Sequence, residues 1–147
     1  MANQKPQSFK NHVRFVPLYH GFVFFIFLFN FGWRISRLVK FGISFGSVMA
    51  VLMAAAFLVL FFFVRVFALT VQDRVIRLEM RLRLAEILPA DLRPRIPEFS
   101  VGQLVALRFA SDAELPALAR KVLDEKLNDR KAIKQLVKDW QGDYLRA

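Results

Sequence analysis

The residues best suited to chemistry are few, and they stand far apart in this sequence. Its two histidines, His12 and His20, lie near the start, whereas every Asp and Glu occurs at Asp73 or later. General acid–base catalysis and metal-assisted hydrolysis need such groups close together. The absence of cysteine excludes thiolate nucleophiles and cysteine metal sites, and the six glycines form no phosphate-binding loop. We therefore expect no catalytic residue, no metal site and no enzymatic activity.

His20 is the one residue whose surroundings suit a ligand. Imidazole is a common axial ligand of haem and chlorophyll metals, and one side of His20 is apolar. The favoured alternative is that His20, beside Tyr19 at the start of an apolar run, is an interfacial anchor with its polar tip among lipid headgroups. We expect the chain to hold no cofactor of its own and to make at most peripheral contact with pigments or lipids.

Two long apolar runs must position these residues. Residues 16–33 are broken only by Pro17, His20 and Asn30 and cover about 27 Å as a helix, whereas residues 41–64 carry no charge and cover about 36 Å. Both lengths suit a hydrocarbon core about 30 Å thick. The first run follows a polar arm, residues 1–15, and offers no cleavage motif of small residues, so we interpret it as an uncleaved helix. The short basic loop 34–40 predicts a transmembrane hairpin.

The basic residues predict where the hairpin sits. Residues 1–65 carry seven Lys/Arg and no acid, whereas residues 66–147 carry fifteen Lys/Arg and twelve Asp/Glu. An excess around the apolar segments favours anionic headgroups over nucleic acid. Counting cations near the span ends predicts a multi-pass protein of the bacterial inner membrane with both termini in the cytoplasm. The residues expected at the membrane surface are Arg14, Arg34, Arg37, Lys40 and Arg65.

Small residues in the second span predict close helix packing. They recur every fourth position, which places them on one helix face: Gly42, Gly46, Ala50 and Ala54. The first span of the same molecule is the favoured partner, and a neighbouring subunit is the alternative. Asn30 lies deep enough to need a hydrogen-bond partner, which we expect to be Ser44 or Ser47 across the hairpin.

The second span should continue past the membrane, because no Gly or Pro occurs between Gly46 and Pro89. This extension, residues 65–88, carries apolar residues with alternating spacings of four and three: Val71, Val75, Leu78, Leu82 and Ala85. Such a seam binds either a partner helix or the protein's own tail. The spacing also predicts local ion pairs, Asp73 with Arg77 and Glu79 with Arg83.

The rest of the chain reads as a linker and a small helical domain. Three prolines mark residues 89–99 as an extended linker. Residues 100–147 predict three short helices, two of them started by capping boxes. The expected caps are Ser100 with Gln103, Ser111 with Glu114, and Asn128 or Asp129 for a last helix reaching Trp140. Fewer than fifty residues form a marginal hydrophobic core, so we expect this domain to pack against a further surface for stability.

Several strings of this sequence resemble a family of small bacterial membrane proteins of unknown function. They are residues 4–7 (QKPQ), 11–17 (NHVRFVP), 72–86, 103–110 (QLVALRFA), 129–134 (DRKAIK) and Trp140. The resemblance covers nearly the whole chain and implies the all-α architecture of a two-helix membrane hairpin with a cytoplasmic helical extension and tail. It implies no activity and no ligand.

The functional expectation is therefore structural. We expect a non-enzymatic accessory subunit that bridges or stabilises a larger membrane complex, with a photosynthetic reaction centre and its light-harvesting antenna as the best candidate. Its partners would be other integral membrane subunits and lipids, and not nucleic acid. The alternative is a self-associating membrane adaptor that recruits a cytoplasmic partner.

Overall fold

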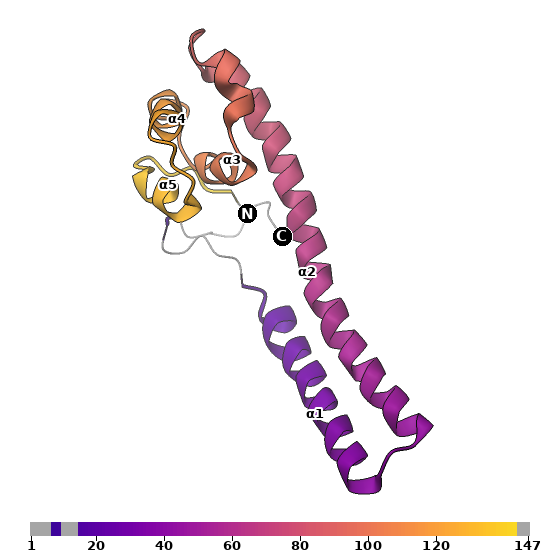
Figure 1. Cartoon of the computed structure of the whole chain (residues 1–147). Coiled ribbons are helices and arrows are strands. Elements are labelled where there is room, and N and C mark those ends of the chain that lie inside the picture. The colour runs from indigo at the N-terminus through magenta and orange to yellow at the C-terminus, as the bar shows by residue number, and fades with distance from the viewer. Residues whose placement is uncertain (1–6, 10–14, 144–147) are drawn as a thin grey trace. The chain divides into compact units, whose positions relative to one another are not determined.

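The chain is described by a computed structural model, in which residues 7–9 and 15–143 are placed. Two compact units make it up: Arg14–Leu69 is one, and Thr70–Ala147 with Met1–Val13 is the other. The described residues are helical, with short connections and one isolated bridge between Ala110 and Trp140. The all-helical prediction is confirmed for this part of the chain (Figure 1).

The first unit consists of two helical stretches joined by a short turn. A π-helical segment, Pro17–Val23, leads directly into α1, Phe24–Phe41, and α2 begins at Phe45. Residues 34–40, which we expected to form the loop, are instead the last two turns of α1. Basic residues do not break a helix, and no Gly or Pro stands between Gly32 and Gly42. The chain turns at Gly42, whose φ of 87° and ψ of 172° suit glycine almost alone.

Aromatic rings connect α1 and its π-helical start to α2. Tyr19 stacks on Phe61 with ring centroids 4.3 Å apart, and its hydroxyl donates to the Phe61 carbonyl oxygen. Two turns further along, Phe27 stacks on Phe57 at 5.4 Å. Offset aromatic pairs at such distances add to the packing energy. The phenylalanines of the two apolar runs therefore account for part of the contact between them.

Two helical stretches of the described chain are long and apolar enough to cross a membrane. They are Pro17–Phe41, with 25 residues, and α2, Phe45–Ile87, with 43. Their most apolar windows are almost entirely uncovered by the rest of the chain, at 0% and 6% buried. The core helix of a soluble protein would bury a large share of such a window.

Helix α2 continues without interruption through the arginine-rich segment, as the absence of Gly and Pro predicted. It ends at Ile87, two residues before Pro89, and the Leu88 amide still donates to the Leu84 carbonyl at 2.9 Å. Proline disfavours helical geometry in the residue before it, which explains the end point.

The second unit contains the last part of α2 and three short helices, α3 (Val101–Leu107), α4 (Leu115–Asp124) and α5 (Arg130–Leu136). The number of helices after the linker is as predicted. The linker itself is not extended throughout, because a 3₁₀-helix, Arg93–Glu98, occupies its second half. Short i→i+3 turns accommodate proline better than an α-helix interior does.

The start of α3 confirms one capping box. Ser100 accepts from the Gln103 amide at 3.2 Å, and the Gln103 side chain accepts from the Ser100 amide at 2.8 Å. At α5, Asp129 caps by accepting from the amides of Lys131 and Ala132. That helix stops at Leu136, short of Trp140.

The capping box predicted for α4 is wrong. The N-cap of α4 is Glu114 and its side chain makes no cap bond, while the Ser111 hydroxyl is buried without a hydrogen-bond partner among the described residues. The Glu114 carboxylate accepts instead from the amides of Lys138 and Asp139, at 3.1 and 3.3 Å. A contact with the segment after α5 has displaced the local one.

The core of this unit explains how so short a tail folds. One face of α2 contributes Ile76, Met80 and Leu84, and Leu88 follows directly after the helix, in a buried cluster that takes in side chains of α3, α4 and α5. In Figure 1 the three short helices gather on one side of the end of α2. The three short helices pack against α2, the preceding helix of the same chain. The side chains of α2 enlarge the hydrophobic core, which fewer than fifty residues could not form alone.

Candidate helix-binding surface

The predicted seam on α2 is exposed. Val71, Val75, Leu78 and Leu82 are 61%, 49%, 62% and 61% accessible to solvent. Because an α-helix turns about 100° per residue, these positions lie nearly opposite the buried stripe of Ile76, Met80 and Leu84. The alternative that the seam packs on the protein's own tail is therefore wrong. The tail occupies the other face of the same helix segment.

The structure shows a second apolar stripe on this helix segment that was not predicted. Ile76, Met80, Leu84 and Leu88 follow one another at steps of four, a pattern that itself predicts a buried helix face. The spacing therefore carries a signal for this stripe as well as for the seam. The segment has two apolar faces, and the chain covers one of them.

The ion pairs of this segment also differ from the prediction. Asp73 pairs with Arg130 of α5 at 3.6 Å, and Arg83 pairs with Asp112 at 2.6 Å. Arg77 and Glu79 have no partner among the described residues. The long-range contacts of Arg83 stabilise the fold more than the predicted ion pair with Glu79 would. The Arg83 guanidinium also donates to the carbonyls of Arg108 and Ala110, at 3.2 and 2.7 Å.

Ion pairs at the surface of the second unit shift the pKa values of Asp91 and Arg95. A hydrogen bond from Arg120 to the Asp91 carboxylate, at 2.5 Å, lowers the pKa of Asp91. Arg95 donates to Asp124 at 2.8 Å and also pairs with Glu98, and these acceptors raise the pKa of the Arg95 guanidinium. Both pairs join the 3₁₀ segment or the residues before it to α4, and so they connect the linker to that helix.

The predicted small-residue stripe of the second span is only partly buried. Ala54 is buried at 1% exposure and Ala50 is half-buried, but the space where a Cβ would stand at Gly46 is open. Gly42 is not on the helix at all, because it lies in the turn. The contact face of α2 at this level is therefore built from alanines and the rings of Phe57 and Phe61 rather than from a four-residue small stripe.

Asn30 does not bond to the serines as predicted. Ser44 and Ser47 exchange hydrogen bonds with each other, since the Ser44 amide donates to Ser47 Oγ at 2.8 Å and the Ser47 amide donates to Ser44 Oγ at 3.2 Å. This reciprocal cap satisfies the start of α2. The side-chain amide of the half-buried residue Asn30 has no hydrogen-bond partner within residues 7–9 and 15–143.

The predicted surface cations lie in different surroundings. Arg34 and Lys40 are exposed, Arg65 is half-buried, and Arg37 stands 5.2 Å from the centroid of the Phe41 ring. Arg14 lies outside the described residues. Arg34 and Arg37 line a hollow of about 330 Å³ beside Ser44 and Ser47, which gives the turn a positive potential.

His20 is engaged with its own turn. Its Nδ1 is 3.1 Å from both the backbone N and the O of Val16, and its ring stacks on Phe15 with centroids 5.1 Å apart. A haem or chlorophyll metal would have to bind the other ring nitrogen. In the part of the chain that the structure describes, no three of its His, Asp and Glu residues cluster in a way that could hold a metal ion.

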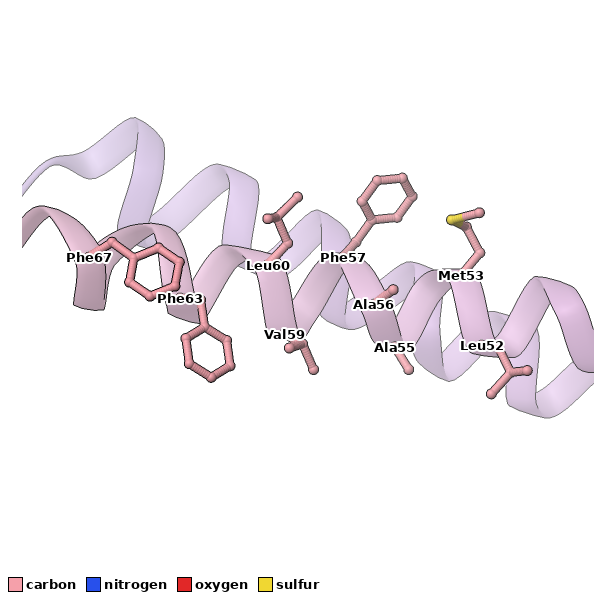
Figure 2. Close-up of a pocket in the computed structure, with 9 residues that line it drawn as sticks. All are labelled: Leu52, Met53, Ala55, Ala56, Phe57, Val59, Leu60, Phe63 and Phe67. Atoms are coloured by element: carbon pink, nitrogen blue, oxygen red, sulfur yellow. The ribbon is translucent and has the colours of Figure 1, made fainter.

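A broad apolar face covers α2 at the level of the second span. Figure 2 shows nine side chains, all from α2 and none of them polar, with Met53, Phe57 and Leu60 on one side and Leu52, Val59 and Phe63 on the other. Such a face fits hydrocarbon, either lipid chains or another apolar helix. It offers no group that could orient a polar ligand.

These features define an all-helical protein with two helices able to span a membrane and a small helical domain built on the end of the second. The matching family model covers residues 1–147, and the chain belongs to the family of unknown function DUF6526. No curated protein and no solved structure shows significant similarity to the chain.

Proposed function

We propose that the chain is a non-enzymatic structural protein of the membrane, in which an α1–α2 hairpin anchors the helical domain and the last part of α2 binds a partner helix. One observation carries this proposal. Four large apolar side chains, Val71, Val75, Leu78 and Leu82, stay exposed on a helix whose opposite face is buried by the chain's own domain. A contiguous exposed apolar stripe of this kind marks an interaction surface.

Membrane insertion is supported by the exposed rings of the first unit. Phe25, Phe29, Phe62 and Phe67 are each more than 60% exposed. Leaving apolar area in water costs about 25 cal/mol per Å², whereas lipid covers it without that cost. We infer that the basic turn of the hairpin lies at one membrane surface, and the cation count supports an orientation with both termini in the cytoplasm of a bacterial inner membrane.

The structural role has two forms. In the first, the chain is an accessory subunit that bridges or stabilises a larger membrane complex, and the photosynthetic reaction centre with its antenna stays a prediction within this form. The uncovered apolar faces at the level of the spans support it, since other integral subunits fit there. In the second, the chain is a self-associating adaptor whose domain recruits a cytoplasmic partner, and the charges that flank the seam favour this form.

The test is purification from native membranes in mild detergent, followed by mass-spectrometric identification of the bound chains. The wild type should resist alkaline extraction from the membrane and should elute with a partner. The double variant L78E/L82E should stay in the membrane but lose that partner, because two carboxylates would be buried in the interface. Arg77→Glu, a change at an exposed position off the seam, should retain it. Release of the wild type by alkali, or equal retention by all three proteins, refutes the proposal.

A further inference from the structure

The flanking charges on α2 identify the partner. With Val71 and Leu78 at position d of a heptad and Val75 and Leu82 at position a, the flanking g positions are Arg74 and Arg81, and the e positions that follow are Glu79 and Glu86. In a parallel two-stranded coiled coil, each g side chain meets the e side chain five residues further along the other helix. Arg74 therefore meets Glu79, and Arg81 meets Glu86.

These charges are available for such pairs. Arg74, Glu79 and Glu86 are exposed, and their side chains have no partner among the described residues. The Nε of Arg81 is buried and also lacks a partner there. Each g position carries a cation and each of the two facing e positions an anion, so a second copy in the same register is complementary at every pair.

We propose that the seam pairs two copies of this chain as a parallel, in-register coiled coil. The opposite orientation is disfavoured by the same charges. In an antiparallel pair, g faces g and e faces e, which would bring arginine against arginine and glutamate against glutamate. Like charges across an interface select against the wrong partner arrangement. This inference rests on the proposed membrane insertion, which gives both copies the same direction.

Membrane insertion also answers two arguments against a coiled coil between two copies. Two heptads are fewer than a free coiled coil needs, but two copies held in one bilayer meet at a high effective concentration. Lipid does not cover the seam instead, because Leu78 lies about 20 Å along the helix from Arg65, the first charge after the span. The headgroup layer on each side is only about 6 Å thick.

Single cysteines test the register directly, because the natural sequence has no cysteine. Leu78→Cys places the thiols of two copies face to face at a d position only if the helices are parallel and in register. We expect a mild oxidant to convert most of the full-length protein in lipid bilayers to a disulfide dimer. The matched control is Arg77→Cys, exposed one residue away but off the seam, which should cross-link at least tenfold more slowly. Equal rates for the two variants overturn the proposal.

Charge reversal separates a second copy from any other partner. Arg74→Glu faces Glu79 of the other copy with a like charge, and because symmetry repeats the pair, dimer affinity in bilayers should fall by about tenfold. The double variant R74E/E79R restores opposite charges between two identical chains and should recover the affinity. Energy transfer between labelled copies, diluted in lipid, measures the affinity.

The outcomes distinguish this inference from the proposed function. If the double variant does not recover, or if Leu78→Cys cross-links to a different membrane protein, the homodimer is wrong while the structural role stands. If the wild type is monomeric in bilayers and binds nothing, both are wrong. Recovery by the double variant, together with Leu78 cross-linking, supports both.

Discussion

The guanidinium of Arg83 on α2 lies 2.6 Å from Asp112, in the segment before α4, and it also donates to two backbone carbonyls of that same segment. One side chain thus fixes the turn after α3 to the helix that leaves the first unit. Its side chain is 22% exposed, so these bonds form in a partly desolvated setting.

Replacing Arg83 by Ala should destabilise the helical domain by about 1–3 kcal/mol, because the carbonyls of Arg108 and Ala110 lose their donor. Arg83→Lys should recover only part of the loss, since an ammonium cannot span the same fork of acceptors. Denaturant titration followed by Trp140 fluorescence, in a Trp33→Phe background, measures the change. Arg77→Ala is the control and should shift the free energy of unfolding by less than about 0.5 kcal/mol. An equal loss in both variants would contradict the assigned contacts.

Leu84 and Leu82 stand two residues apart on α2 and should respond oppositely to truncation. Leu84 is 0% exposed and Leu82 is 61% exposed. Leu84→Ala should cost the domain about 2–5 kcal/mol and leave self-association intact in conditions where the domain stays folded. Leu82→Ala should leave domain stability nearly unchanged and weaken self-association. If both variants changed both domain stability and self-association, the two faces of α2 would not have separate roles.

Gly42 and Gly46 form a second matched pair. Gly42 has a positive φ, so Gly42→Ala should strain the turn by about 1–3 kcal/mol. Gly46 lies inside α2 with open space around its Cα, and Gly46→Ala should stabilise the helix by up to about 1 kcal/mol. Unfolding in mixed detergent micelles compares them. A loss at Gly46 would mean that another helix packs against that position in the assembly.

The Asp91–Arg120 pair predicts a limited sensitivity to acid. Its hydrogen bond lowers the pKa of Asp91 in the folded state, so the stabilisation is present above the unfolded pKa, about 3.9, and is lost as the pH falls through the folded pKa. Asp91→Asn should therefore be less stable than the wild type at pH 7, and its stability should decline less below about pH 4, so that the two proteins converge in acid. Denaturation midpoints from pH 2.5 to 7 measure it. An unchanged acid slope in Asp91→Asn would exclude this pair as the source.

The structural features that depend on residues close together in the chain could be predicted from the sequence. The uninterrupted α2 follows from the lack of Gly and Pro between Gly46 and Pro89, and the Ser100–Gln103 cap follows from its spacing. The end of α1 differs from the prediction because the basic residues 34–40 are compatible with a helix, and α1 continues up to Gly42.

Contacts between residues far apart in the sequence are harder to predict. Nothing in the spacing of Arg83 indicates that Asp112, rather than Glu79, is its partner, because that pairing depends on how the domain folds back onto α2. The same folding decides which of the two apolar faces of α2 is buried. The seam could be predicted as a candidate surface, but its exposure required the packing of Leu84 and Met80 to be known.

The central claim is that this chain acts by holding another helix at the end of α2. Native mass spectrometry of the protein extracted in its own lipids tests it most directly, because it counts the chains in each particle. We expect particles with at least a second chain for the wild type and for Arg77→Glu, and single chains for L78E/L82E. A wild-type particle that contains one chain and lipid alone would contradict it.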